Sequence, residues 1–168
     1  KLGEGRINIE DTEGHRMRVQ ILHGTETGTA EILSEDLLAG VEGKVDASIA
    51  SLEDIAPAEL DPDVFYIFVS STTGSGDVPA TAEYFYNSLR QETPDLSRIQ
   101  FAIFGLGDRS FDFTFNQGSE KLMTELIRCK AVQVGERGLH DGSSDDLPEE
   151  VALPWLENIL AVARASAH

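Results

Sequence analysis

Residues 25–30 (TETGTA) combine hydroxyl side chains with the backbone N–H groups of an expected helix start. Such N–H groups carry partial positive charge and attract anions. The segment has no lysine and is therefore no Walker A loop, and it lacks the G-x-G-x-x-G spacing. We expect it to bind a terminal monophosphate, the alternative being a threonine-rich turn that caps the helix. The candidate residues are Thr25, Glu26, Thr27, Gly28, Thr29 and Ala30.

Residues 70–77 (SSTTGSGD) place two glycines within three positions, which permits close approach of a flat ligand to the backbone. Taken alone, this segment favours a flexible turn, because Pro79 stands where a dinucleotide fingerprint needs a third glycine.

Residues 105–116 (GLGDRSFDFTFN) bring three aromatic rings into a loop that should otherwise be polar. Aromatic rings beside a ligand suggest a stacking surface for a planar ring. We expect stacking from Phe111, whereas core packing is the expectation for Phe113 and Phe115.

The remaining reactive residue types form no pattern. The chain has one cysteine, Cys129, and its four histidines are scattered, so no metal-ligand spacing exists. No G-x-S-x-G motif supports a serine nucleophile. Acidic residues gather at 141–150 without the spacing of an EF-hand, and they predict a solvated loop.

Strand-like apolar runs alternate with helical patterns along the chain. We expect strands at 18–23, 44–49, 64–69, 99–104 and 131–135, and helices at 30–40, 79–90, 119–129 and 149–163. This alternation predicts an α/β fold, a doubly wound parallel sheet with helices on both faces. Ligands bind such sheets at the carboxyl ends of the strands. The loops 24–30, 70–79, 105–118 and 137–147 should therefore form one composite site.

Composition limits the function classes. The 168 residues include 13 Lys and Arg against 30 Asp and Glu, a formal charge of −17, which argues against nucleic-acid binding. No apolar run has the length of a membrane helix, and no signal peptide is evident, so we expect a cytoplasmic protein. Residues 1–16 are expected to be a flexible lead-in and 17–168 the folded domain. The missing initiator methionine suggests processing or excision from a longer chain.

In combination, TETGTAE, SSTTGSGDVP and FGLGDRSF resemble the flavodoxin family of FMN-binding domains, over about residues 19–160. The sequences of these motifs are similar to those of short-chain, MioC-like flavodoxins and of FMN domains of diflavin reductases such as cytochrome P-450 reductase and sulfite reductase. The resemblance implies a five-stranded, flavodoxin-like sheet of order 2-1-3-4-5 with FMN as cofactor. The long-chain insertion should be absent, because the last strand is expected to be uninterrupted.

The resemblance also implies roles for individual residues. Residues 25–30 would surround the FMN phosphate, and Asp141 would be an acidic residue near the isoalloxazine ring. One face of the isoalloxazine would meet Ser71, Thr72, Thr73, Gly74 and Gly76; the other would meet Gly105, Leu106, Gly107, Asp108, Phe111, Phe115 and Asn116.

The implied function is a one-electron carrier, not an enzyme with its own substrate pocket. It would be a monomer that passes electrons from an NAD(P)H-dependent reductase to a haem or iron–sulfur acceptor, through partners with basic faces. It would bind neither nucleic acid nor membrane. The alternatives are an FMN domain excised from a diflavin reductase and a flavodoxin-like quinone reductase. A response-regulator receiver is disfavoured, because acids are missing at 23–24 and 70–71.

Overall fold

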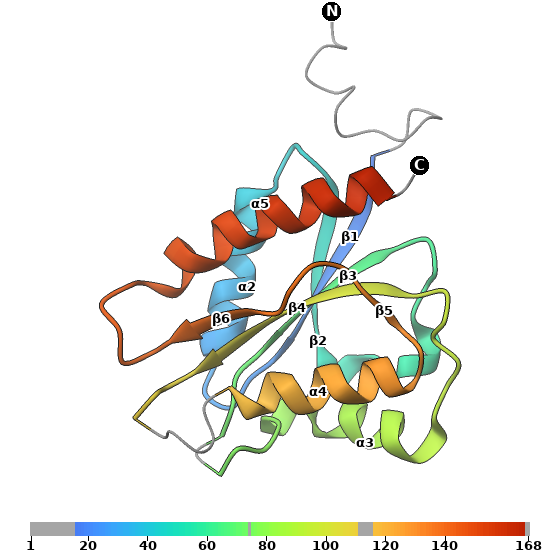
Figure 1. Ribbon diagram of the computed structural model, residues 1–168, viewed down its shortest axis with the longest axis horizontal. Helices are drawn as coiled ribbons and strands as arrows, with labels where there is room; N and C mark the ends of the chain where they lie inside the picture. The colour runs from blue at the N-terminus through green and yellow to red at the C-terminus, as the bar shows by residue number, and fades with distance from the viewer. Residues whose placement is uncertain (1–15, 74, 111–115, 167–168) are drawn as a thin grey trace, which may run out of the picture.

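A computed structural model describes residues 16–73, 75–110 and 116–166 (Figure 1). Its strands all run parallel and form one sheet in the order β2-β1-β3-β4-β5, which confirms the predicted topology. The strands are β1 (Arg18–Gly24), β2 (Asp46–Ser51), β3 (Phe65–Ser70), β4 (Gln100–Gly107), β5 (Val132–Gln133) and β6 (Gly138–Asp141).

Two short strands share the last position of the sheet. β5 pairs with Gln100 and Phe101 at the beginning of β4, and β6 pairs with Phe104–Gly107 at its end. The prediction of one uninterrupted last strand at 131–135 was therefore wrong. The chain leaves the sheet after β5, and Gly135 lies there in the left-handed region with a φ of 72°. The site loop consequently begins at Gly142 and not at position 137.

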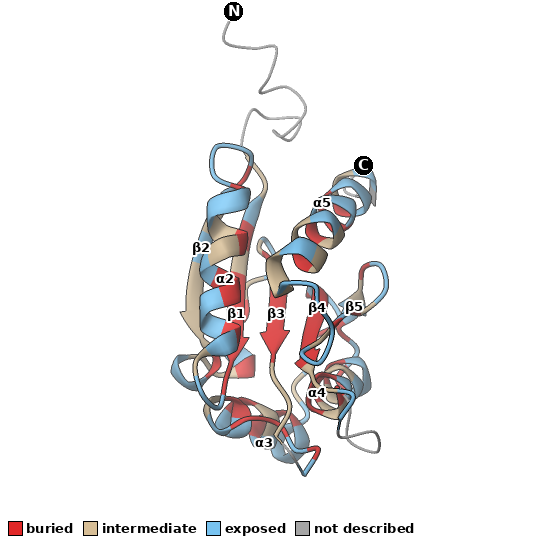
Figure 2. Ribbon diagram, turned by 90° about the vertical axis from the view of Figure 1, so that its left-hand side faces the viewer, coloured by how far each residue is buried: buried red, intermediate tan, exposed pale blue. Residues whose placement is uncertain are grey.

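Helices cover both faces of the sheet (Figures 1 and 2). α2 (Thr29–Gly40) and α5 (Pro148–Ser166) lie on one face, and α3 (Glu83–Glu92) and α4 (Gln117–Arg128) on the other. Short 3-10 turns complete the connections: η2 (Leu52–Asp54), η3 (Pro57–Glu59) and η4 (Ala80–Ala82).

The core is divided by the sheet into two apolar clusters. Every residue of β3 is buried, as expected for a central strand covered on both faces (Figure 2). Ile67 packs toward α2 and α5, whereas Phe68 packs toward α3 and α4, 5.9 Å from the ring centre of Phe101. Each such buried side chain contributes roughly 1.5–3 kcal/mol, so the sheet is a rigid platform for the loops at its ends.

Four large apolar residues of the predicted helices are exposed: Ile32, Tyr84, Ile127 and Val162. Ile32 is 62% exposed and Tyr84 is 55% exposed, while Phe85 and Leu89 on the same helix as Tyr84 are buried. Trp155 packs inward, edge-on to Phe104, with ring centres 5.2 Å apart. Within the described part of the chain, no helix is long and apolar enough to cross a membrane.

Candidate functional site

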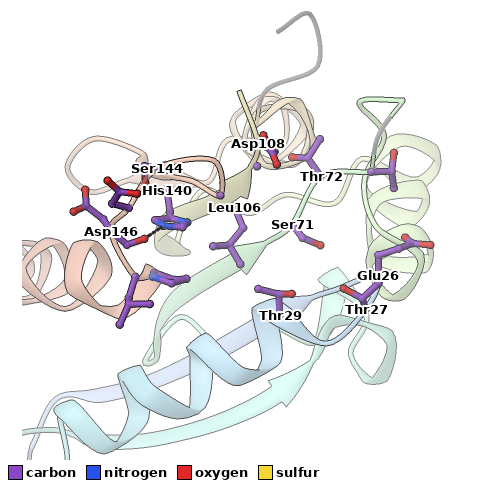
Figure 3. A pocket seen from close by; sticks show the side chains of 16 residues that line it. Glu26, Thr27, Thr29, Ser71, Thr72, Leu106, Asp108, His140, Ser144 and Asp146 are labelled. Carbon is purple, nitrogen blue, oxygen red and sulfur yellow. Dashed lines mark hydrogen bonds between the residues drawn. The ribbon is translucent and has the colours of Figure 1, made fainter. Parts of the chain in front are cut away.

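A cavity of about 840 Å³ opens at the edge where the carboxyl ends of β1, β3, β4 and β6 meet (Figure 3). In Figure 3, Thr27 and Thr29 lie on one side of it, with His140, Ser144 and Asp146 on the other. The described residues that line it are Glu26, Thr27, Thr29, Ser71, Thr72, Thr73, Leu106, Gly107, Asp108, His140, Gly142, Ser144, Asp145, Asp146, Leu147 and Pro148.

The loop after β1 presents the start of α2 to this cavity. Gly28 is the N-cap, with a φ of 99° that favours glycine, and no side chain caps the helix. The first N–H groups of α2 are therefore available to an anion, with Thr27 and Thr29 beside them.

Thr25 and Glu26 brace this loop. The buried Thr25 hydroxyl accepts a hydrogen bond from Gly28 N at 2.7 Å, and Thr25 N donates to Thr81 Oγ1 at 2.8 Å. Glu26 accepts from Ala80 N at 2.9 Å. Thr25 thus supports the loop from behind, whereas Glu26 both braces the loop and lines the cavity.

The loop after β3 is held from two directions. Ser71 N donates to the carbonyl of Gly24 at 3.1 Å, and Thr72 Oγ1 accepts from Gly118 N at 3.0 Å. Thr73 and Asp77 close a turn through two hydrogen bonds, Thr73 N to Asp77 O and Asp77 N to Thr73 Oγ1. Ser71, Thr72 and Thr73 consequently form one fixed wall of the cavity.

Asp77 also joins this turn to α4. Its carboxylate accepts a hydrogen bond from Lys121 Nζ at 3.1 Å. That bond, together with one from Ser75, lowers the pKa of Asp77 below its ordinary value.

The opposite wall consists of Leu106, Gly107 and Asp108 at the end of β4. A Cβ atom on Gly107 would come within 2.8 Å of the backbone nitrogen of Asn116, so only glycine fits there. Asn116 is 1% exposed and lies behind this wall.

Asp141 does not line the cavity but connects two of its loops. Its Oδ1 accepts from Arg109 N at 2.9 Å, from Ser143 N at 2.9 Å and from Ser143 Oγ at 2.7 Å. The bond from Arg109 N is the main reason why the pKa of Asp141 lies below its ordinary value, and Ser143 adds to the effect.

β6 and the loop after it contribute a part of the cavity for which the sequence analysis predicted the loop 137–147 but named only Asp141 as a candidate residue. His140 is 6% exposed, and its Nε2 forms a 2.8 Å hydrogen bond with the carbonyl of Asp146. The sequence feature that pointed to this segment was its predicted position directly after the last strand of the sheet. The residues of β6 and the following segment that line the cavity are His140, Gly142, Ser144, Asp145, Asp146, Leu147 and Pro148.

The predicted candidates fall into three groups. Nine line the cavity: Glu26, Thr27, Thr29, Ser71, Thr72, Thr73, Leu106, Gly107 and Asp108. Behind or beside it lie Thr25, Gly28, Ala30, Gly76, Gly105, Asn116 and Asp141. Gly74, Phe111 and Phe115, with Phe113, are outside the described residues.

The lining is rich in hydroxyl side chains, which can form hydrogen bonds with a polar ligand. The described lining includes neither cysteine nor lysine, and the described residues contain no group of acids, histidines or cysteines suited to a metal ion. An anion-attracting helix start in the same cavity as the two loops after β3 and β4 suits a ligand with a terminal phosphate.

Comparison with known proteins agrees with this geometry. The family model described as Flavodoxin matches residues 21–155. Protein MioC of Escherichia coli (strain K12) is 32% identical over 138 residues, which cover 82% of this chain and 92% of MioC. A cysteine-to-serine mutant of flavodoxin from Pseudomonas aeruginosa superposes with a TM-score of 0.75 at 28% identity, covering 87% of this chain and 98% of that one.

Other relatives are much longer than this chain. The NADPH-dependent diflavin oxidoreductase 1 of Schizosaccharomyces pombe is 34% identical over 145 residues, 84% of this chain but 25% of that protein. The pyruvate dehydrogenase [NADP(+)] of Cryptosporidium parvum is 32% identical over 157 residues, 88% of this chain but 8% of that protein. The same unit therefore occurs both alone and as a small part of larger oxidoreductases.

Proposed function

Because the chain belongs to the flavodoxin family, we propose that it binds FMN non-covalently and carries single electrons between a reductase and an acceptor protein. Bound FMN supplies the redox chemistry, since its ring system takes up and releases electrons one at a time. The protein's own residues set the affinity, the exposure and the electrostatic surroundings of that ring.

The phosphate would be held by the start of α2. The helix has no side-chain cap, and Thr27 and Thr29 offer hydroxyl groups beside its free N–H groups. Thr25 and Glu26 keep this loop in shape through Gly28, Thr81 and Ala80. A site with N–H and O–H donors but no lysine or arginine suits a monophosphate ester.

The ring would lie between the two walls of the cavity. Ser71, Thr72 and Thr73 would face one side, to which the family resemblance also assigns Gly74. Leu106, Gly107 and Asp108 would face the other, where the family resemblance also assigns Phe111. The backbone of both walls is fixed by hydrogen bonds to neighbouring elements, so little ordering is needed when the ring binds.

The observation that carries the proposal is the uncapped start of α2 opening into the same cavity as the two walls. The test is the absorption spectrum of the purified protein, before and after acid treatment, with titration of the apoprotein by FMN. A yellow protein that releases FMN supports the proposal. A colourless protein that ignores added FMN refutes it.

The partners would be redox proteins with basic docking faces. A formal charge of −17 attracts such faces and accelerates encounter at low ionic strength. An NAD(P)H-dependent reductase as donor and a haem or iron–sulfur protein as acceptor fit this role, with the chain acting as a cytoplasmic monomer. The folded carrier would comprise residues 17–168.

A second candidate function is supported by the longer relatives. The match to a quarter of a diflavin oxidoreductase suggests an FMN domain that receives its electrons from a reductase domain of the same polypeptide. The full-length gene product distinguishes the two. Steady oxidation of NAD(P)H with a quinone, without added reductase, would instead indicate a quinone reductase.

A further inference from the structure

Arg137 lies between β5 and β6, where the last position of the sheet is interrupted. Its Nη1 donates to the backbone carbonyl of Asn116 and to Oγ of Ser119, both at 2.8 Å. Within the described residues, no carboxylate forms an ion pair with this guanidinium. In a chain with a formal charge of −17, this cation is therefore held by neutral groups. Burial lowers the pKa of Arg137, against an opposing effect of Glu120, which indicates partial desolvation of the charge.

The residue that Arg137 holds has an unusual backbone. Asn116 has a φ of 55° and a ψ of 22°, in the left-handed region, and is the N-cap of α4. Its carbonyl accepts hydrogen bonds from Ser119 Oγ at 3.1 Å and Glu120 N at 3.2 Å, in addition to the one from Arg137. This convergence of donors stabilises a conformation that is otherwise costly.

Asn116 in turn packs directly against a wall of the cavity. A Cβ atom on Gly107 would come within 2.8 Å of Asn116 N, and one on Gly105 within 2.4 Å of Asn116 Oδ1. Asn116 Nδ2 also donates to the carbonyl of His140 at 3.4 Å. Gly107 and His140 both line the cavity, so a displacement of Asn116 must move the surfaces that face a bound ring.

We infer that Arg137 is a positioning residue of the flavin site, which holds Asn116 against Gly107 and places a positive charge behind that wall. The inference rests on the proposed function and adds to it a residue that does not line the cavity. Two effects should be separable. The hydrogen bonds position the wall and so set flavin affinity, whereas the charge favours the reduced flavin, which is the more negative form.

The test compares Arg137→Met and Arg137→Lys with the matched control Arg128→Met. Arg128 also bridges α4 to another element, through the carbonyl of Leu89 at 3.0 Å and Thr93 Oγ1 at 3.2 Å, but it lies at the opposite end of that helix. Kd values for FMN and riboflavin and the midpoint potential of bound FMN are measured for each variant.

The expected result is specific to Arg137. Arg137→Met should raise the Kd values of FMN and riboflavin alike, by about tenfold or more, because hydrogen bonds to a charged group are lost. It should also make the midpoint potential more negative. Arg137→Lys should restore the potential more than the affinity, since it keeps the charge but not the planar geometry of the donors. Arg128→Met should leave both quantities unchanged.

Two outcomes overturn the inference while the proposed function stands. In the first, Arg137→Met has the same Kd values and midpoint potential as the parent. In the second, these quantities change no more than they do in Arg128→Met. If Arg137→Met does not fold, Ser119→Ala and Arg137→Lys decide, since both alter the hydrogen bonds and keep the charge, and parental affinity for FMN in both refutes the role. In the apoprotein, amide exchange at Glu120 should be faster in Arg137→Met than in Arg128→Met, and equal rates also refute it. A parent that fails to bind FMN removes the proposed function itself.

Discussion

The carboxylate of Asp141, at the end of β6, accepts a 2.9 Å hydrogen bond from the backbone N–H of Arg109, which follows β4. A second bond runs parallel to it, from Gly142 N to the carbonyl of Gly107 at 2.7 Å. Together they join the two loops that meet at the cavity edge. The acid that the family resemblance places near the ring therefore also has a structural role in this chain.

We predict that Asp141→Ala loosens this connection. Amide exchange at Arg109 and Ser143 should accelerate, and FMN should bind several-fold more weakly, because three hydrogen bonds to Oδ1 are lost. Exchange by NMR and an FMN titration measure the two effects. The matched control is Glu157→Ala, which removes one negative charge from an exposed position of α5 outside the cavity lining. Equal losses in both variants would show that charge, and not the hydrogen bonds of Asp141, matters.

The pH dependence of this connection follows from the lowered pKa of Asp141. A carboxylate whose pKa is lower in the folded than in the unfolded state stabilises the fold above the unfolded value, about 3.9. That contribution disappears as the pH falls through the folded value. At neutral pH the connection should be fully formed, and the protection of the Arg109 amide, relative to its intrinsic exchange rate at each pH, should fall only in acid.

A second prediction concerns the phosphate end of the site. Thr27→Ala and Thr29→Ala should each weaken FMN by up to roughly 1.5–3 kcal/mol, the cost of a lost hydrogen bond to a charged group. Riboflavin, which lacks the phosphate, should lose much less. Calorimetric titration of both ligands gives the comparison, and Thr124→Ala on the exposed face of α4 is the control. Equal losses for FMN and riboflavin would contradict a phosphate site here.

Most of the fold could be predicted from the sequence because its central strands are long apolar runs. The split of the last strand could not. β5 has two residues and β6 has the sequence GLHD, too short and too polar for a periodic signal. β6 forms because β4 extends to Gly107 and offers backbone partners to the chain that passes beside it. The exposure of Ile32 and Tyr84 could not be predicted either, because apolar residues lie on more than one face of each helix.

The candidate site shows a similar division. All four loops of the site could be predicted from their position at strand ends, and in three of them the residue types also indicated ligand binding. The segment 142–148 was interpreted as a solvated acidic loop, and its residues are indeed mostly exposed. Its place at the cavity was predicted from the strand end before it, but its individual contacts, such as His140 Nε2 with the carbonyl of Asp146, depend on tertiary structure that no local pattern encodes. The stacking expected from Phe111 stays a prediction.

A third prediction tests the fit of Gly118 at the start of α4. A Cβ atom there would lie 2.6 Å from the carbonyl oxygen of Ser71 and 2.9 Å from Thr72 Oγ1. Gly118→Ala should therefore displace the 71–73 wall and weaken FMN and riboflavin by similar factors, despite the better helix propensity of alanine. Ligand titrations and thermal unfolding measure this, again with Thr124→Ala as control. Unchanged affinity for both ligands would mean that the wall does not contact the ring.

A fourth prediction concerns the negative surface. With a formal charge of −17, electron transfer to a basic partner should slow as ionic strength rises from low values, because screening weakens long-range attraction. Stopped-flow rates at dilute protein concentration test it, with an uncharged small-molecule acceptor as the reference reaction. If the rate of electron transfer to the protein partner is as insensitive to salt as the reference rate, the prediction is wrong. The acidic surface would then contribute to solubility and not to docking.

The last prediction concerns His23, which is 7% exposed at the end of β1 and whose Nδ1 has no hydrogen-bond partner among the described residues. Burial lowers its pKa below 6.5, although four nearby carboxylates oppose the shift: Glu31, Glu35, Asp54 and Glu53. The unfolded chain therefore binds this proton more readily than the folded chain. The resulting stability is complete above the unfolded pKa and declines as the pH falls from about 6.5 toward the folded value.

Replacing His23 with leucine removes this proton from both states. Compared with the parent, the apoprotein of His23→Leu should gain free energy of unfolding as the pH is lowered from 7.5 to 5.5, approximately the range below the ordinary histidine pKa. Urea unfolding of both proteins across that range measures the difference. Contributions from the carboxylates are common to the two proteins and largely cancel. If the difference in free energy of unfolding between the two proteins stays constant with pH, His23 titrates equally in the folded and unfolded chains. Its burial at the end of β1 then carries no electrostatic cost.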